Sequence, residues 1–357
     1  MTKILLVGEA RGEREARFDH GFVGSSGVEL AKMLGQVDLA PFPSAKYPSE
    51  LDMIMHWQYL RKTKGIDIAN VFNAHPSNND IEEFFTNSAE GITSIPPLRP
   101  GKYVRPEYLS HLHQLWAKIE EDKPNLIIAL GNTACWAVLG ESKISALRGT
   151  VKLSPRLNVK VLPTFHPAAV LRQWNLRTVV LADLEKAKSE AEYPEIRRIE
   201  RFVTVMPTLE EIADWITRPA DYYAVDIETR TFRHQSLISM IGFARSPSDA
   251  LVIPFFDDKS ETGSYWPTVE AEMKVWRMTD TLLRSPVPKV FQNGIFDLSH
   301  LLRMGFRPAQ CAHDTMLLHH ALYPEMLKGL GFLGSIYSKE IAWKGMRKRG
   351  DNLKRDE

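Results

Sequence analysis

KILLVGEARGEREARFDHGFVGSSG, residues 3–27, is the stretch that decides the fold. It opens with the apolar run ILLV, which is typical of a strand buried on both faces of a parallel sheet. The run breaks at Gly8 into a loop with three carboxylates and an aromatic residue: Glu9, Glu13, Glu15 and Phe22. Open α/β sheets bind ligands at the carboxyl ends of their strands, so we expect a site here. An exposed Phe22 would offer a flat face for stacking, and a plain connecting loop is the alternative.

The overall composition indicates a soluble globular protein of more than one domain. The chain has 357 residues, 44% of them hydrophobic and 25% charged, with a formal net charge of +1. That length exceeds one typical core, so two domains are expected. Without a run of 18 apolar residues or a signal peptide, we expect a cytoplasmic protein with no membrane partner. Any DNA binding would depend on local basic patches.

The order of predicted elements divides the chain in two. Strand–loop–helix units repeat up to about residue 190, which predicts an α/β domain with a mostly parallel sheet, and Asn132 is expected to cap one of its helices. A polar linker follows, and then three strands in succession predict an antiparallel meander. The predicted domains are residues 1–195 and 196–357, with a charged, frayed tail after residue 342.

Four elements of the first domain are expected to meet at one sheet edge: the acidic loop, Asn70 after its strand, the 131–132 turn and His166. Phe22 offers a stacking face, and the amide of Asn70 can pair with both a donor and an acceptor on a base. His166 can donate to a carbonyl that gains charge when a glycosidic bond breaks. These groups together suit a nucleotide flipped out of the base stack. The alternatives are that His166 is a loop histidine bonded to the backbone, that Asn70 caps a turn and that Phe22 belongs to the core.

The same segments resemble family 4 uracil-DNA glycosylases. Residues 8–27 resemble the family motif GEAPGxxEdxxGxPFVGxAG, IANVFNAHP resembles its Asn-bearing strand, and TFHPAAVLR resembles its THPSxLLR element. The resemblance spans about residues 3–190 and implies a three-layer glycosylase-like fold with a central parallel sheet.

The resemblance also implies a role for each residue that matches a motif. Phe22 would stack on uracil, Asn70 would read its Watson–Crick edge, and His166 would bond the carbonyl. Glu15 would position the attacking water and Glu9 would shape the pocket floor. Val170 and Leu171 would press into the minor groove where the base has left.

Two departures from the family pattern stand out. Arg11 occupies the position of a Pro, which changes the stiffness of the loop and adds charge beside the pocket. The chain has only two cysteines, Cys135 and Cys311, so we expect no iron–sulfur cluster, although the family carries one.

A second group of carboxylates lies in the second domain. Asp226 and Glu228 are two residues apart in an apolar strand, so both should lie on one face. Two such acids repel each other unless a cation lies between them, and oxygen ligands suit Mg²⁺ or Mn²⁺. With Asp297, which follows Asn293 in QNGIFD, they form a candidate metal site able to hydrolyse a phosphodiester. An exposed strand edge is the alternative.

Residues 201–343 resemble the 3′→5′ proofreading exonuclease domain of family-A DNA polymerases, an RNase H-like fold. The resemblance implies that Asp226, Glu228 and Asp297 are catalytic metal ligands and that Asn293 contacts substrate. Asp314 matches an acidic position that opens a core helix. The family's third motif, Tyr-x-x-x-Asp, is missing, so we expect a domain truncated before that motif, with Asp351 or Asp356 as unusual substitutes.

The combined pattern suggests a DNA-processing protein of replication or repair, with DNA as its partner and a phage as its source. One hypothesis is a uracil-DNA glycosylase joined to a metal-dependent exonuclease, either alone or as the front part of a split DNA polymerase. The alternative is a catalytically degenerate DNA-binding or polymerase-accessory subunit.

Overall fold

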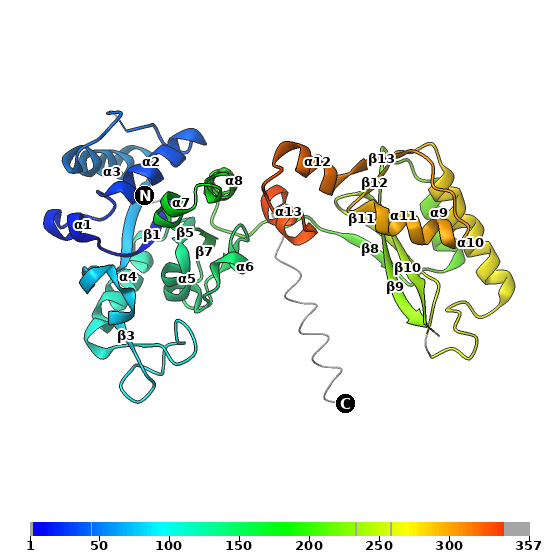
Figure 1. Cartoon of the computed structure of the whole chain (residues 1–357), viewed down its shortest axis with the longest axis horizontal. Coiled ribbons are helices and arrows are strands. Elements are labelled where there is room, and N and C mark those ends of the chain that lie inside the picture. The colour runs from blue at the N-terminus through cyan, green and yellow to red at the C-terminus, as the bar shows by residue number, and fades with distance from the viewer. Residues whose placement is uncertain (1–2, 44, 233, 258, 339–357) are drawn as a thin grey trace. The chain divides into compact units, whose positions relative to one another are not determined.

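The chain folds into two compact units. The computed structural model describes residues 3–43, 45–232, 234–257 and 259–338. The first unit contains the chain up to residue 197 together with residues 331–338, and the second contains residues 198–330 (Figure 1). The charged tail, with Asp351 and Asp356, lies outside the described residues.

The first unit is built on a five-stranded sheet of order β2-β1-β5-β7-β6, in which only β6 is antiparallel to its neighbour. Its strands are β1(Ile4–Ala10), β2(Ile66–Phe72), β5(Leu126–Leu130), β6(Lys152–Leu153) and β7(Lys160–Thr164). A separate two-stranded sheet pairs β3(Phe85–Thr86) with β4(Tyr103–Val104). The mostly parallel sheet predicted from the sequence is confirmed.

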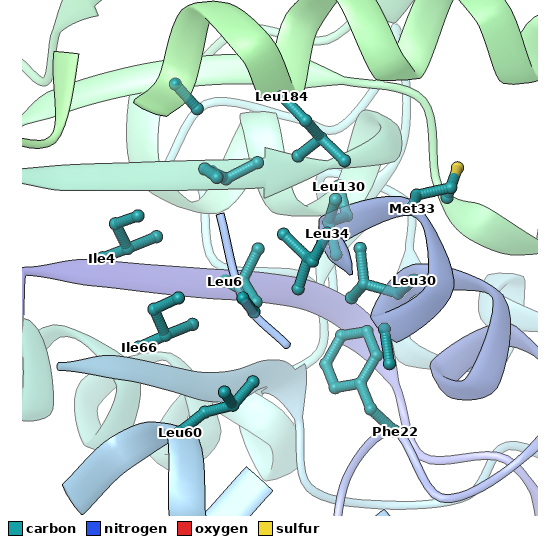
Figure 2. Packing of buried hydrophobic residues seen from close by; sticks show 14 of the residues in the cluster. Ile4, Leu6, Phe22, Leu30, Met33, Leu34, Leu60, Ile66, Leu130 and Leu184 are labelled. Carbon is teal, nitrogen blue, oxygen red and sulfur yellow. The ribbon is translucent and has the colours of Figure 1, made fainter. Parts of the chain in front are cut away.

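Helices cover both faces of this sheet because successive side chains of each strand point to opposite sides. Ile4 and Leu6 of β1 pack with helices α2(Ser25–Gln36), α3(Glu50–Lys64) and α8(Leu176–Glu190) (Figure 2). Leu5 and Val7 pack on the other side with α4(Leu109–Asp122) and α5(Gly131–Leu139). The result is a three-layer α/β/α arrangement.

Shorter helices complete the first unit: α1(Glu13–Phe18), η1(Ser77–Asn79), η2(Ile81–Phe84), η3(Pro106–Tyr108), α6(Ile144–Leu147) and α7(Pro167–Arg172). The expected N-cap at Asn132 is wrong, because α5 is capped by Leu130 and Asn132 lies inside the helix. The Asn132 Oδ1 atom instead accepts hydrogen bonds from the backbone N–H groups of Lys143 and Ile144. No helix in the described part of the chain is both long and apolar enough to span a membrane.

The second unit has a six-stranded mixed sheet of order β13-β12-β9-β10-β11-β8. Its strands are β8(Phe202–Val205), β9(Tyr223–Phe232), β10(Gln235–Ser246), β11(Asp249–Pro254), β12(Lys289–Phe291) and β13(Cys311–Asp314). Strands β9, β10 and β11 form the predicted antiparallel meander, and β12 and β13 add in parallel beside β9. This order and these directions are those of the expected RNase H-like sheet. The helices are α9(Leu209–Thr217), α10(Val269–Arg284), α11(Gly294–Arg303) and α12(Thr315–Leu322).

Helix α13(Leu330–Tyr337) follows the second unit in sequence but packs with the first. The Arg148 guanidinium donates to Ser335 Oγ at 2.7 Å, and the Lys186 ammonium donates to the Ser335 carbonyl oxygen at 2.8 Å. Gly149 permits this approach, because a Cβ there would lie 2.7 Å from that carbonyl oxygen. The sequence alone places this helix in the second domain.

Candidate active site

A cavity of about 670 Å³ lies at the carboxyl edge of the first unit's sheet. The segments that follow β1, β2, β5 and β7 all contribute to its wall. The predicted site residues Glu9, Glu15, Phe22, Asn70 and His166 all line it. The structure therefore brings together the four elements that the sequence placed at this edge.

Gly8 lets two of these side chains approach the end of β1. It is aligned with Asn70 in the parallel pairing of β1 with β2. A Cβ at Gly8 would lie 2.4 Å from Asn70 Oδ1 and 2.6 Å from Phe22 Cζ, far inside normal contact. The amide of Asn70 and the ring of Phe22 thus occupy the space that a side chain at Gly8 would fill.

Phe22 is fixed by its backbone as well as by its ring. Its φ of 57° lies in the left-handed region, and its carbonyl oxygen accepts a hydrogen bond from Trp57 Nε1 at 3.0 Å. The ring lies edge-on to Trp57 and stacks toward His166 with a centroid distance of 6.5 Å. The expectation of an exposed Phe22 is wrong: only 3% of the residue is exposed, because the ring joins the core beneath the cavity.

His166 is held as a neutral hydrogen-bond donor. Its Nδ1 atom accepts a hydrogen bond from the Ala168 backbone N–H at 3.2 Å, which places the ring proton on Nε2. Burial, assisted by the positive charge of Arg172, lowers the pKa of His166 to about 4. At neutral pH the ring therefore carries no charge and keeps one N–H, on Nε2, as a hydrogen-bond donor.

Glu15 organises the loop that carries Phe22. Its carboxylate accepts a hydrogen bond from the Gly12 backbone N–H at 3.0 Å, and the backbone N–H groups of Phe22 and Gly24 also contribute. Burial nevertheless raises the pKa of Glu15, because these hydrogen bonds offset only part of the desolvation. The side chain thus sets the loop conformation as well as facing the cavity.

The other two glutamates of the loop differ from Glu15 and from each other. Glu9 accepts a hydrogen bond from Thr133 Oγ1 at 2.5 Å, and burial raises the pKa of its carboxyl group. Glu13 forms an ion pair with Arg17 on the exposed side of α1. These placements agree with a pocket-floor role for Glu9, and that role stays a prediction.

Helix α7 follows His166 and turns its two expected wedge residues in opposite directions. Val170 is fully buried in the core against the helices, so it is not available to contact DNA. Leu171 is 45% exposed beside the cavity residues Ala169 and Arg172. The expectation for Val170 is wrong, whereas Leu171 remains a candidate wedge.

These features match a known family. The family model of the uracil DNA glycosylase superfamily matches residues 1–188. The chain belongs to that superfamily. It is 30% identical over 193 residues to a type-4 uracil-DNA glycosylase of Thermotoga maritima, covering 53% of this chain and 77% of that protein. It is 28% identical over 210 residues to a type-4 enzyme of Sulfurisphaera tokodaii, covering 57% of this chain and 76% of that protein.

Two solved structures align with only part of this chain, at low sequence identity. Escherichia coli RNase D, an exoribonuclease, aligns with a TM-score of 0.30 and 19% identity, covering 40% of this chain and 34% of that one. Brucella melitensis NrnC with bound Mg²⁺ aligns with a TM-score of 0.24 and 20% identity, covering 39% of this chain and 61% of that one.

Arg11, the predicted departure from the family motif, lines the cavity. Its guanidinium forms an ion pair with Asp19, and its carbonyl oxygen contacts His75 Nδ1 at 3.1 Å. Arg11, Arg14 and Arg172 give the cavity wall three cationic side chains. Arg14, Arg172 and Thr133 were not predicted as site residues, although Arg172 ends the motif-like TFHPAAVLR segment.

The donor set of the first unit does not fit an iron–sulfur cluster. Cluster ligation in proteins uses several cysteine thiolates. The two cysteines of the chain fall in different units, and Cys135 is fully buried in α5. Burial raises the pKa of the Cys135 thiol to about 12, so it stays protonated.

The second unit brings Asp297 against the strand that carries Asp226 and Glu228. Both β9 carboxylates lie on the exposed face, and Val225 and Ile227 point into the core, as the period of two predicts. The backbone N–H of Ile227 donates to Asp297 Oδ1 at 3.1 Å. Burial and the nearby charge of Asp226 raise the pKa of Asp297 to about 6.

Asp314 and Asn293 hold the beginning of α11. Asp314 accepts hydrogen bonds from the backbone N–H groups of Asn293 at 3.2 Å and Gly294 at 2.7 Å while it also caps α12. Across the described residues, no three or more His, Cys, Asp or Glu side chains are grouped to hold a metal ion. The metal-ligand set therefore stays a prediction.

Proposed function

We propose that the first unit hydrolyses the N-glycosidic bond of a uracil nucleotide flipped out of DNA. The observation that carries this proposal is that His166, with Nδ1 occupied by the Ala168 N–H and its proton therefore on Nε2, lines the same cavity as Asn70 and Phe22. Membership in the superfamily and 30% identity to a type-4 enzyme support it.

In this proposal each side chain acts on one part of the nucleotide. The ring of Phe22 stacks on uracil, and the amide of Asn70 pairs with the base edge. Water attacks the sugar C1′ atom, and the bonding pair of the C1′–N1 bond leaves with the base as a uracil anion. His166 donates Nε2–H to the carbonyl oxygen that gains this charge.

Glu15 orients the attacking water and takes up its proton. Its burial raises its pKa, so the ionised carboxylate is a stronger base than an exposed glutamate. Glu9, tied to Thr133, closes the floor.

The test is release of uracil from a single-uracil oligonucleotide by the full chain. The variants Asn70→Ala, His166→Ala and Glu15→Gln are expected to lose at least about 100-fold in rate. Glu120→Gln is the control, because Glu120 is exposed on α4 and does not line the cavity. A wild-type chain that leaves uracil in place would refute the proposal.

A second candidate function, metal-dependent 3′→5′ digestion of DNA, is favoured by the Asp226–Asp297 pair. Burial, together with the nearby charge of Asp226, raises the pKa of Asp297 to about 6, and Mg²⁺ or Mn²⁺ would relieve the repulsion between the two carboxylates. End-labelled DNA incubated with Mg²⁺ or with a chelator tests this function. Asp226→Asn should abolish digestion, whereas the control Glu270→Gln, on the exposed side of α10, should not. Digestion that the chelator leaves unaffected would exclude a metal-dependent nuclease.

A DNA-holding role beside a polymerase, in a phage or elsewhere, is the remaining alternative. It predicts salt-dependent DNA binding without turnover at either site. Detection of released uracil or of released nucleotides would contradict it.

A further inference from the structure

The segment after the cavity helix presents a second aromatic residue to solvent. Residues 171–175, LRQWN, are exposed in succession after the buried Val170. Within them Trp174 is 63% exposed, although a tryptophan side chain gains more than most from burial. Single exposed aromatics are common on proteins, so its surroundings decide whether it has a role.

Trp174 is supported on one side by a fixed cation. The Arg177 guanidinium carbon lies 5.2 Å from the centre of the Trp174 ring. Arg177 is itself held by Glu29 Oε1 at 2.7 Å and by Gln36 Oε1 at 2.5 Å, both on α2. A ring held against an immobile guanidinium loses little freedom when a second flat group stacks on it.

Trp174 also lies close to the cavity mouth. It follows the cavity residue Arg172 by two positions, so their Cα atoms are separated by at most about 7 Å. Stacked bases along one strand rise about 3.4 Å each, so this separation corresponds to at most about two nucleotides. Exposed Leu171 lies between the cavity residue Ala169 and Trp174 in sequence.

We propose that Trp174 is a stacking site for an unpaired nucleobase next to the nucleotide that enters the cavity. An aromatic face flanked by arginines is the composition of sites that hold single-stranded DNA without reading its sequence. The inference rests on the proposed function for the position of the flipped base, and it makes single-stranded DNA the preferred substrate class. Trp174 is a binding residue here and takes no part in bond cleavage.

The test compares Trp174→Ala, Trp174→Phe and the control Tyr59→Ala, which removes another exposed aromatic ring of the same unit that does not line the cavity. Single-stranded oligonucleotides carry one uracil and a 2-aminopurine either one or two positions away on each side. With wild type and Trp174→Phe, 2-aminopurine fluorescence at one of these positions should be quenched. With Trp174→Ala the quenching should disappear.

The kinetic readout separates binding from chemistry. Trp174→Ala should raise KM for single-stranded substrate by about 5- to 100-fold with kcat unchanged. Trp174→Phe keeps an aromatic ring, so its KM should stay close to that of the wild type. Unchanged KM and quenching in Trp174→Ala would overturn the inference, as would an equal effect of Tyr59→Ala. If wild type releases no uracil but Trp174→Ala still abolishes quenching, the proposed glycosylase activity fails while the stacking site stands.

Discussion

Replacing Gly8 by alanine should damage the active site without unfolding the protein. The added Cβ would lie 2.4 Å from Asn70 Oδ1 and 2.6 Å from Phe22 Cζ, where ordinary contact begins near 3.4 Å. Each group must therefore retreat by roughly 1 Å, and displacement of a substrate-positioning group by that distance costs about 100-fold in rate. The same crowding should lower the free energy of unfolding by about 1 to 3 kcal/mol.

The assay is single-turnover release of uracil by Gly8→Ala, combined with thermal unfolding. Gly24→Ala is the matched control, because Gly24 lies in the same loop, has a φ of −80° and has no atom within 4 Å of the position that a Cβ would take. Gly24→Ala should keep both its rate and its melting temperature. A Gly8→Ala protein with a wild-type rate would refute the inferred placement of Asn70 and Phe22, and equal losses in both variants would show that the loop tolerates no change.

Three further predictions follow from the charges of the two units. The His166 ring should show no NMR titration between pH 8 and 5.5, because its pKa is about 4. The unfolded chain binds this proton more tightly, so the contribution of His166 to the free energy of unfolding should fall as the pH drops from 6.5 to 4. An NMR titration midpoint near pH 6.5 would contradict the buried neutral ring. Asp297→Asn should raise the free energy of unfolding of the second unit at pH 7 by about 1 to 3 kcal/mol. The pKa of Asp297 is raised to about 6, so its protonated form stabilises the folded state fully below pH 3.8, and this contribution is lost as the pH rises through 6. An uncharged Asn avoids that loss. Urea unfolding should show that gain vanish at pH 3.5, and a gain that persists there would point to packing instead of charge. Asp19→Ala should lower kcat/KM because it leaves the Arg11 cation unpaired beside the cavity, and adding Arg11→Ala should restore most of that loss. A double variant as slow as Asp19→Ala would show that the ion pair does not couple the two residues.

The sequence predicts the sheets well because buried strands carry continuous or alternating apolar residues. The apolar run at residues 4–7 predicts a strand buried on both faces, and the alternation of apolar and acidic residues around Asp226 predicts a strand buried on one face. The burial of each residue in the structure agrees with both patterns. The polar residues that end β1, β2 and β7 are therefore placed at one edge without knowledge of the helices between them. This is why Asn70 and His166 could be named from the chain alone.

Features that depend on packing between distant segments could not be predicted in this way. Phe22 packs in the core with Trp57 of α3, which also donates a hydrogen bond to the Phe22 carbonyl oxygen. Helix α3 has only a weak apolar stripe and was not predicted. Its Ser49–Asp52 capping box was the signal available in the sequence. Likewise, nothing near Ser335 indicates that α13 packs against Arg148 and Lys186 of the first unit.

Two departures from the glycosylase motif compensate for each other in space. Arg11 replaces the motif Pro, and Asp19 replaces the motif Gly at a position with φ of 49°, a conformation that Asp tolerates better than most residues. The two side chains form an ion pair across α1, so the loop gains a contact where it loses the stiffness of Pro. Asp19 is 87% exposed, which makes the contact weak in energy, yet it directs the Arg11 guanidinium toward Asp19. A Pro-to-Arg change alone would add an unpaired cation beside the base-binding groups. With Asp19 as its partner, Arg11 leaves the cavity compatible with an uncharged base. The presence of Arg11 is therefore no argument that the site is inactive.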